Sequence, residues 1–290
     1  MKLLNFGSLN IDHVYGVAQF VAPGETLSAL SYEKNAGGKG LNQSIALARA
    51  GAAVYHAGMI GEDGRFLSDL LATEGVDVTH LAVTAHPTGH AVIQVAPDGQ
   101  NAILVCAGAN GRISADCMRS VLDCFDGGDW LLLQNEVAGL SDLIALAKER
   151  GMRVILNPSP ITDGLLNADL SAVDCLILNE TEGLALTGEQ SPEAVLTALA
   201  KRYPRAEVIL TLGADGAWWQ AEGERLYRPA CKVDAVDTTA AGDTFTGYFL
   251  ASRAAGDPPA IALERATRAA AIAVTRPGAA ASVPYRNELE

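Results

Sequence analysis

The alternation of strands and helices is clearest in residues 153–188, RVILNPSPITDGLLNADLSAVDCLILNETEGLALTG. Here the short apolar runs RVILNP and CLILNE are separated by a segment long enough to hold a helix. The runs WLLLQ (130–134) and EVILTLG (207–213) continue the pattern on either side. Strands that alternate with helices form right-handed βαβ units, which build a parallel sheet covered on both faces. The sequence therefore predicts an α/β fold, a three-layer αβα sandwich with a mostly parallel central sheet.

Two segments interrupt this alternation between βαβ units. Residues 13–34 and 88–106 alternate apolar with polar residues, and the second turns at Pro97–Asp98–Gly99, a hairpin signal. They could be unrelated surface hairpins, or they could pair into a small sheet that forms a lid. With the second interpretation the α/β core comprises residues 1–12, 35–87 and 107–290, and the β lid comprises residues 13–34 and 88–106.

The composition restricts the possible partners. Of 290 residues, 49% are hydrophobic and 19% charged, and the net charge is −13. We therefore expect no nucleic-acid partner, and an anionic ligand such as a nucleotide would need local donors or a metal ion. The five cysteines show no disulfide-like pattern, which favours reduced thiols in the cytoplasm. We expect neither a signal peptide nor a membrane span, because no apolar segment approaches the ~20 residues that a span needs.

The stretch AVDTTAAGDTF (235–245) places Asp243 after three small residues and before an apolar, helix-like run. Asp is favoured at helix N-termini, where it caps free N–H groups and complements the helix dipole. The same carboxylate could instead act as a base toward a ligand bound over the helix end. The spacing alone favours the capping interpretation.

Two glycine- and amide-containing motifs suggest a polyhydroxylated ligand. NAGGKGLNQ (35–43) is a tight turn before a helix, but Gly40 stands where a P-loop needs Ser or Thr, and the dinucleotide pattern G-x-G-x-x-G is absent. In GSLNIDH (7–13), Asn10 and Asp12 follow the first strand and would share one face. Ligands of parallel α/β sheets bind beyond the carboxyl ends of strands. Both motifs could also be structural turns.

Three later motifs remain ambiguous on their own. LILNETEGLALTG (176–188) could hold hydrated magnesium or only cap a helix. TLGADGAWW (211–219) could bind a nucleotide or form a plain hairpin. TRPGAAASVP (275–284) is a loop of small residues whose carbonyls are free to turn inward.

Taken together, these motifs resemble the ribokinase-like sugar kinases nearly from end to end. The matching text is GSLNIDH, PGET, GGKGLNQ, AGAN, NETE, TLG, VDTTAAGDTF and the C-terminal AIAVTR, GA and SVP. The motifs GGKG-x-NQ and DT-x-AAGDTF, in that order, are the most specific. The resemblance implies a central sheet between helices and a β lid over the sugar.

The resemblance also implies an activity, the transfer of the γ-phosphate of ATP to the primary O5 hydroxyl of D-ribose. Asp243 would be the base, and the N–H groups of Ala241, Gly242 and Asp243 would face the γ-phosphate. The implied sugar contacts are Asn10, Asp12, Gly38, Lys39, Asn42 and Glu136. The implied nucleotide contacts are Asn179, Thr211 and Gly213, with Glu182 holding Mg²⁺ through water.

Two further properties follow from the resemblance. A potassium ion would bind to the carboxylate of Asp237, the carbonyls of Thr239, Arg276 and Gly278, and the hydroxyl of Ser282. The protein would form a homodimer through the lid, because a small two-hairpin sheet is marginal alone and leaves open edges.

Several positions depart from the family pattern and leave the acceptor open. His90 stands where an aliphatic residue is common, Pro277 and Ala280–Ala281 alter the cation loop, and Thr267 and Arg268 alter the adenine edge. The alternatives are another pentose, a ketohexose or a nucleoside, although the lid has few aromatic residues to hold a base. A non-catalytic sugar-binding protein would be expected to lack Asp243 or the small residues before it. A dinucleotide-dependent oxidoreductase would need the absent glycine motif.

Overall fold

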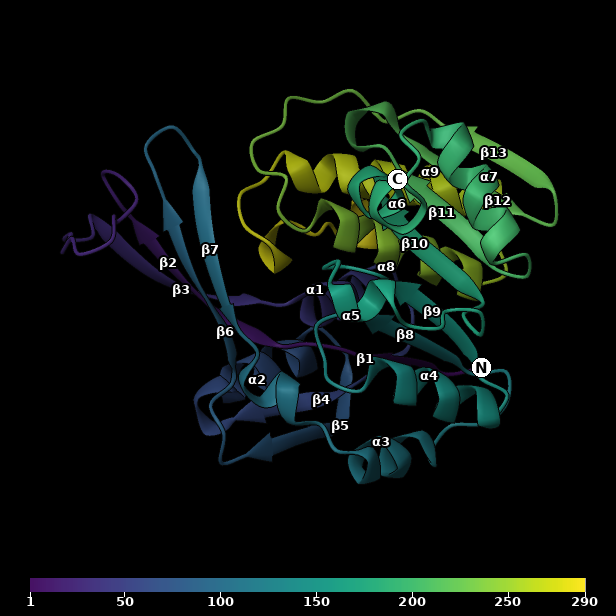
Figure 1. The fold of residues 1–290 in the computed structure, drawn as a ribbon, viewed down its shortest axis with the longest axis horizontal. Helices are drawn as coiled ribbons and strands as arrows, with labels where there is room; N and C mark the ends of the chain where they lie inside the picture. Colours follow the sequence, from purple (N-terminus) through teal and green to yellow (C-terminus); the bar gives the residue numbers. More distant parts are fainter. Residues whose placement is uncertain (290) are drawn as a thin grey trace.

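The structure, a computed structural model that describes residues 1–289, contains a nine-stranded sheet between helices (Figure 1). The strand order is β13-β12-β11-β10-β9-β8-β1-β4-β5, with parallel pairing from β11 to β5 and antiparallel pairing of β12 and β13. The strands are β1 (Leu3–Phe6), β4 (Val54–Gly61), β5 (Asp77–Thr84), β8 (Trp130–Gln134), β9 (Arg153–Asn157), β10 (Cys175–Asn179), β11 (Glu207–Thr211), β12 (Ala217–Ala221) and β13 (Glu224–Arg228). The predicted three-layer fold with a mostly parallel sheet is confirmed.

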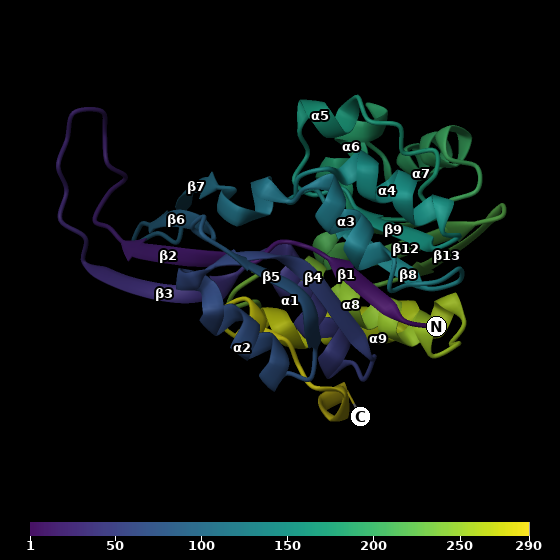
Figure 2. The same cartoon turned by 90° about the horizontal axis from the view of Figure 1, so that it is seen from below.

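Helices cover both faces of this sheet (Figure 2). One face carries α3 (Ala115–Leu122), α4 (Leu140–Glu149), α5 (Asp163–Leu166), α6 (Glu180–Thr187) and α7 (Pro192–Arg202). The other carries α1 (Lys39–Arg49), α2 (Arg65–Thr73), α8 (Ala241–Ala254) and α9 (Pro259–Val274). Short 3-10 turns are η1 (Glu62–Gly64), η2 (Gly108–Arg112), η3 (Gly213–Asp215), η4 (Ala280–Ser282) and η5 (Arg286–Leu289). Among residues 1–289, no helix has the length and apolarity to cross a membrane.

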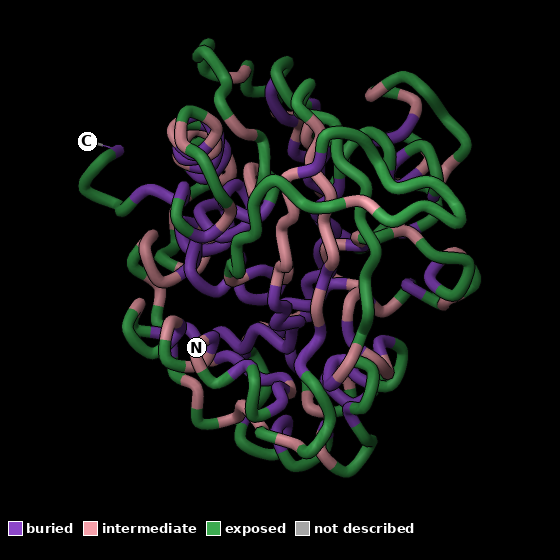
Figure 3. The backbone as a smooth tube through the Cα atoms, turned by 90° about the vertical axis from the view of Figure 1, so that its left-hand side faces the viewer, coloured by how far each residue is buried: buried purple, intermediate pink, exposed green. Residues whose placement is uncertain are grey.

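The central strands are apolar at consecutive positions because both of their faces are buried. In β8, Leu131 and Leu133 pack into the core under α3 and α4, whereas Leu132 points to the core under α1 and α8. Each fully buried leucine contributes about 1.5–3 kcal/mol relative to an exposed one. An uninterrupted apolar run is therefore the expected signature of such a strand. In Figure 3 the buried segments gather toward the middle of the molecule and the exposed ones follow its outer loops.

A second, four-stranded sheet projects from the layered part at the upper left of Figure 1. Its order is β3-β2-β6-β7, from β2 (Asn10–Gly16), β3 (Ser31–Gly37), β6 (Gly89–Val95) and β7 (Asn101–Cys106). The two interrupting segments thus pair with each other through β2 and β6, as the lid interpretation predicts. The strands extend slightly beyond the predicted ranges, since β2 begins at Asn10 and β3 ends at Gly37. The division of the chain into a core and a lid stays a prediction.

Candidate active site

The side chain of Asp243 is buried at the start of α8 and is held by two amides from α1. Asn42 Nδ2 donates to Asp243 Oδ2 at 3.1 Å, and Gln43 Nε2 donates to Oδ1 at 2.8 Å. Asp243 is 7% exposed and is the acidic residue in the first turn of α8, where its charge complements the helix dipole. Its two oxygens accept from side chains of α1, so the carboxylate faces the N-terminal part of that helix.

The residues before Asp243 leave the first turn of α8 open. Ala240 precedes the helix with φ of +57°, a left-handed conformation that costs a non-glycine residue roughly 1–2 kcal/mol. A Cβ added at Gly242 would meet no atom within 4 Å, so packing does not require glycine there. First-turn N–H groups lack intrahelical partners, and the helix dipole favours a negative charge beside them. Open space over such N–H groups suits a bound anion.

Three carboxylates from different parts of the chain lie near Lys39 at the start of α1. Glu136 Oε2 accepts from the Lys39 backbone N–H at 3.0 Å and from the Ser8 hydroxyl. Burial alone would lower the pKa of Lys39, but nearby carboxylates outweigh it and raise that pKa. These carboxylates belong to Asp243, Glu136 and Glu182. Lys39 thus stays charged between the two parts of the site.

Asp12 has an unusual environment for a carboxylate. Burial, followed by the charge of Glu136, raises the pKa of Asp12 from 3.8 to about 6. Both effects disfavour the ionised form, because the group loses water and gains a negative neighbour. A ligand whose hydroxyl groups donate to Asp12 would supply the hydrogen bonds that this carboxylate lacks.

Asn10 is oriented by a buried residue that the sequence analysis did not single out. Asn110 Nδ2 donates to Asn10 Oδ1 at 2.8 Å, and Asn110 also exchanges hydrogen bonds with the backbone of Leu9. Asn110 lies in the AGAN motif and is 1% exposed. Asn10 Oδ1 already accepts one hydrogen bond, whereas its two amide N–H groups have no partner within the described residues and are the part most available to a ligand. Ser8 and Gln43 were missed in the same way, although they lie within quoted motifs.

Two adjoining cavities lie on the other side of Asp243. The smaller, about 210 Å³, is bordered by Lys39, Asn179, Thr211, Gly242 and Asp243 among others. The larger, about 590 Å³, is lined mainly by small and apolar residues and includes Thr211 and Gly213. Both cavities share the residues Thr211, Thr238, Ala241 and Gly242. The predicted nucleotide-binding residues Asn179, Thr211 and Gly213 thus border these two adjoining cavities, and the smaller one reaches Asp243.

Glu182 caps α6 in addition to facing the smaller cavity. Its carboxylate accepts from the Asn179 backbone N–H at 2.9 Å and from Asn179 Nδ2 at 3.2 Å, while Asn179 Oδ1 accepts from the Glu182 backbone N–H at 2.9 Å. This reciprocal arrangement is a capping box. Within residues 1–289 there is no group of three His, Cys, Asp or Glu side chains that could hold a metal ion. A single carboxylate suits an ion that keeps its waters and binds mainly to phosphates.

Asp237 joins the loop before α8 to the C-terminal loop. Its Oδ1 accepts from the backbone and hydroxyl of Thr239 at 2.9 and 2.6 Å, and its Oδ2 accepts from the Gly278 backbone N–H at 2.8 Å. Burial alone would raise the pKa of Asp237, but these hydrogen bonds lower it below 3.8. Ser282 is buried and donates to the Ala279 carbonyl at 2.8 Å. The oxygen atoms predicted to bind a cation therefore lie on two loops that are in direct contact.

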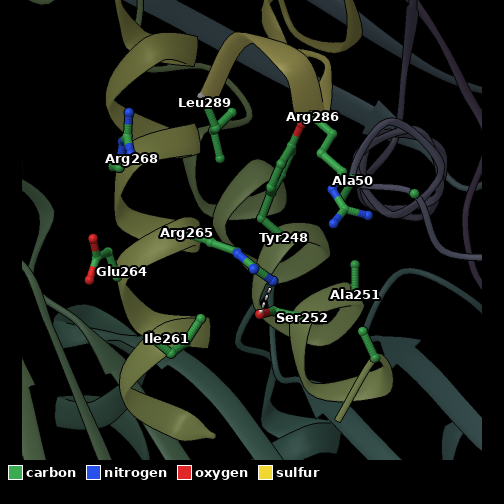
Figure 4. Close-up of a pocket in the computed structure, with 12 residues that line it drawn as sticks. Ala50, Tyr248, Ala251, Ser252, Ile261, Glu264, Arg265, Arg268, Arg286 and Leu289 are labelled. Atoms are coloured by element: carbon green, nitrogen blue, oxygen red, sulfur yellow. Dashed lines mark hydrogen bonds between the residues drawn. The ribbon is translucent and has the colours of Figure 1, made fainter. Parts of the chain in front are cut away.

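A further cavity, about 340 Å³, lies far along α8 from Asp243 (Figure 4). It is bordered by α8, α9 and the C-terminal segment, and Arg265 points across it to the hydroxyl of Ser252 at 3.2 Å. Arg265 also pairs with Asp257. Arg268, expected at the adenine edge, lines this cavity. Its neighbour Thr267 instead lines the cavity of about 590 Å³.

Comparison with known proteins places these features in context. Residues 1–286 match the family described as pfkB family carbohydrate kinase. The ribokinase of Haemophilus influenzae is 38% identical over 295 residues, which cover 97% of this chain and 95% of that protein. The structure of Arabidopsis thaliana ribokinase complexed with ribose and ATP matches with a TM-score of 0.85 and 30% identity, over 99% of this chain and 97% of that one. A deoxyribokinase of Salmonella typhi is 29% identical over 293 residues, 98% of this chain and 96% of that protein.

Proposed function

The chain belongs to the pfkB family of carbohydrate kinases, and on that premise we propose that it transfers the γ-phosphate of ATP to the O5 hydroxyl of D-ribose. It is a phosphotransferase with an alcohol acceptor. The observation that carries the proposal is the position of Asp243, whose buried carboxylate lies in the first turn of α8 and borders the same cavity as Lys39.

We infer that the sugar binds between the second sheet and α1. Asp12 and Asn10 would hold neighbouring hydroxyl groups, with Asn10 donating because Asn110 occupies its oxygen. Gly38, Lys39, Asn42 and Glu136 complete this side of the site. Glu136 is tied to the backbone at the start of α1, which fixes its carboxylate for a further sugar hydroxyl. The second sheet would then act as the lid.

Asp243 would accept the proton of O5 as the oxygen attacks the γ-phosphate. Phosphoryl transfer is largely dissociative, so the nucleophile needs orientation more than early deprotonation. The N–H groups of Gly242 and Asp243 would stabilise the charge on the γ-phosphate, together with that of Ala241, which here makes a long 3.3 Å hydrogen bond to the Thr238 carbonyl. Lys39 borders the same cavity, so its ammonium would share in this. Hydrogen bonds from Asn42 and Gln43 hold the Asp243 carboxylate in one orientation for this proton transfer.

The nucleotide would occupy the two adjoining cavities, with its phosphates toward Gly242 and its base in the larger, apolar cavity. Asn179, Thr211 and Gly213 would contact it. Glu182 would hold a magnesium ion through water, and such an ion supplies positive charge that neutralises the phosphates when bound. The capping box with Asn179 holds the Glu182 carboxylate at the start of α6, where Glu182 borders the smaller cavity.

A potassium ion would bind between the two loops joined by Asp237. The donors would be the Asp237 carboxylate, the Ser282 hydroxyl, and the carbonyls of Thr239, Arg276 and Gly278. Oxygen atoms of this kind can replace the hydration shell of a large monovalent ion. The hydrogen bonds of Asp237 support this arrangement because they already hold the loops together.

The second sheet also supports a homodimer. Every residue of β7 is exposed, and Leu104, Val105 and Ile103 are 71%, 63% and 55% exposed. Leu104 lies on one face of this edge strand and Ile103 and Val105 on the other. Exposed apolar side chains on an edge strand favour coverage by another sheet. A second copy of the chain, packed lid against lid, would provide it. The five free cysteines are consistent with a cytoplasmic protein.

The proposed reaction can be tested with a panel of acceptors. Formation of ADP would be measured with ATP, Mg²⁺ and K⁺ for D-ribose, 2-deoxy-D-ribose, fructose and a set of nucleosides, and the product analysed for the phosphorylated position. We expect the highest kcat/KM for D-ribose and phosphate on O5. A higher value for 2-deoxy-D-ribose or a nucleoside would show that the acceptor is misassigned.

A further inference from the structure

A chain of buried amides runs from Asp243 through the centre of the molecule. Gln134 Nε2 donates to Gln43 Oε1 at 2.7 Å and to Asn5 Oδ1 at 2.9 Å. Asn5 Nδ2 donates in turn to Ser44 Oγ at 2.8 Å and to the Gly40 carbonyl at 2.8 Å. Gln43, Gln134, Asn5 and Ser44 are all 0% exposed. The chain thus connects the carboxylate of Asp243 to strands β1 and β8 without contact with water.

The direction of each hydrogen bond in this chain is fixed by its neighbours. Gln43 uses both of its N–H groups, one on Asp243 Oδ1 and one on Asn157 Oδ1 at 3.1 Å. Gln134 and Asn5 likewise use both of theirs. An amide that turned over would place oxygen against oxygen at both of its contacts. A change of orientation at any one residue would therefore disturb all the others.

The far end of the chain is closed by His56. Its Nδ1 lies 2.8 Å from Ser44 Oγ, and complete burial lowers the pKa of His56 to about 4. The ring is therefore neutral at physiological pH, and its Nδ1 can accept a hydrogen bond from the Ser44 hydroxyl. Ser44 Oγ is then left to accept from Asn5, as observed. The neutral histidine fits the donor direction of the whole chain.

The amide chain is not an optimal arrangement for stability. Gln134 Oε1 and Asn42 Oδ1 are buried and have no hydrogen-bond partner within the described residues. Unpartnered buried oxygens are destabilising, and apolar side chains of the same shape would avoid them. Retention of polar residues here is therefore better explained by a task in the site than by the needs of the core.

We propose that Gln43 and Gln134 are positioning residues, which hold the carboxylate of Asp243 in the orientation that the transfer requires. This inference rests on the proposed function, since it takes Asp243 as the base. Gln43 acts directly on Asp243 Oδ1, and Gln134 acts through Gln43 because its N–H prevents the Gln43 amide from turning over. Gln134 lies at the end of β8 and the amide chain ties it to β1, so the rigid sheet sets the position of the base.

The primary test is Gln134→Met, which keeps most of the side-chain volume but removes the amide. We expect kcat to fall roughly ten- to a hundredfold, the size of effect that a small misplacement of a reacting group produces. KM for sugar and for ATP should stay within about threefold, because neither substrate touches Gln134. The matched control is Gln220→Met, since Gln220 is a buried amide on β12 that donates to the Leu196 carbonyl. We expect the control to keep kcat within about twofold of the wild type.

A double-mutant cycle separates positioning from general damage. In an Asp243→Asn background, Gln134→Met should change the remaining turnover less than about twofold, because the group that it orients is gone. Gln43→Met serves as a second variant if Gln134→Met does not fold, as judged by thermal unfolding. Both variants would be assayed with the acceptor that the wild type phosphorylates fastest. A wrong assignment of D-ribose therefore leaves this test intact.

Three results would overturn the proposal. They are a Gln134→Met enzyme with near wild-type kcat, an equal loss of kcat in Gln220→Met, and a loss that persists undiminished in the Asp243→Asn background. The first would show that the amide chain does not determine the orientation of the Asp243 carboxylate. The other two would show that buried amides support the fold rather than the reaction.

Discussion

Asp243 and Asp12 are both carboxylates of the candidate site, but their surroundings give them different properties. Asp243 accepts two amide hydrogen bonds, which hold it in one orientation. Asp12 is half-buried, and loss of water, followed by the charge of Glu136, raises its pKa to about 6. The first environment suits a base that must be positioned, and the second suits a group that waits for ligand hydroxyls. Each environment leads to a prediction.

Replacement of Asp243 by Asn should lower kcat by roughly 10²–10⁴, the usual contribution of a positioned acid–base group. The Kd for ribose, measured by calorimetry, should change little because the amide keeps the shape of the site. Asp142→Asn is the matched control, since Asp142 is also the third residue of a helix, α4, but is exposed. Near-normal turnover of Asp243→Asn would remove this residue from the mechanism.

The raised pKa of Asp12 predicts a pH dependence of sugar binding. Below about pH 6 the free enzyme increasingly carries a protonated Asp12, so kcat/KM for ribose should fall by up to about tenfold per pH unit. Asp12→Asn should have a lower kcat/KM that no longer shows this acidic limb. An unchanged profile in the variant would assign the limb to another group.

The same shift has a consequence for stability with the opposite sign. Because the folded state raises this pKa above 3.8, the folded state binds the proton more tightly, and stability is lost as pH rises from about 4 to 6. Asp12→Asn should therefore unfold at a higher temperature than the wild type at pH 8, with a smaller difference at pH 4. The site keeps Asp12 charged at neutral pH at a cost in stability.

At the scale of elements, two loops meet at the start of α8. Asp237 from one loop binds the backbone of Gly278 in the other, and Ala240 enters the helix in a left-handed conformation. The loops thus determine where the first N–H groups of α8 point. A cation between them would hold this turn in place, and the orientation of the first N–H groups of α8 would then depend on the C-terminal loop as well.

Activity should therefore depend on the monovalent cation. We expect turnover to rise when K⁺ replaces Na⁺ or tetramethylammonium at constant ionic strength, and Asp237→Ala to abolish this response. Asp234→Ala is a control, since Asp234 is an exposed carboxylate in the same loop. Equal turnover of the wild type in all three salts would show that no functional cation site exists.

At the scale of the whole molecule, the second sheet is the least supported part of the fold. It projects from the layered part (Figure 1). Its strand β7 has exposed apolar residues. A four-stranded sheet with open edges is stabilised by packing against a further surface. If the second sheet acts as the proposed lid, a second copy packed against it would influence access to the site.

Light scattering should give a mass twice the 30.2 kDa of the chain. Leu104→Glu should convert the protein to monomers, because a charge on this exposed strand would be buried in the interface. Leu184→Glu is the control, since Leu184 is 43% exposed on α6, outside the second sheet. A wild-type protein that is monomeric at assay concentrations would contradict the proposal.

The sequence by itself determined the class of fold and the elements that carry the site. In runs such as WLLLQ and CLILNE, consecutive residues are apolar because both faces of the strand are buried. Such a strand can therefore be recognised from adjacent residues in the sequence. The pairing of residues 13–34 with 88–106 was predictable only as one of two alternatives. The motifs shared with the family indicated the principal site residues, and the roles of these residues stay predictions.

Only the tertiary structure decided which polar groups meet. Gln43 and Asp243 are 200 positions apart, and Gln134 and Asn5 are 129 apart, so no local pattern reveals their hydrogen bonds. The pKa of Asp12 depends on the burial that tertiary packing imposes and then on Glu136, which follows β8 far along the chain. Periodicity reports whether a residue is buried, whereas the identity of its partner depends on how strands and helices are arranged in space. For that reason the amide chain behind Asp243 became visible only in the folded molecule.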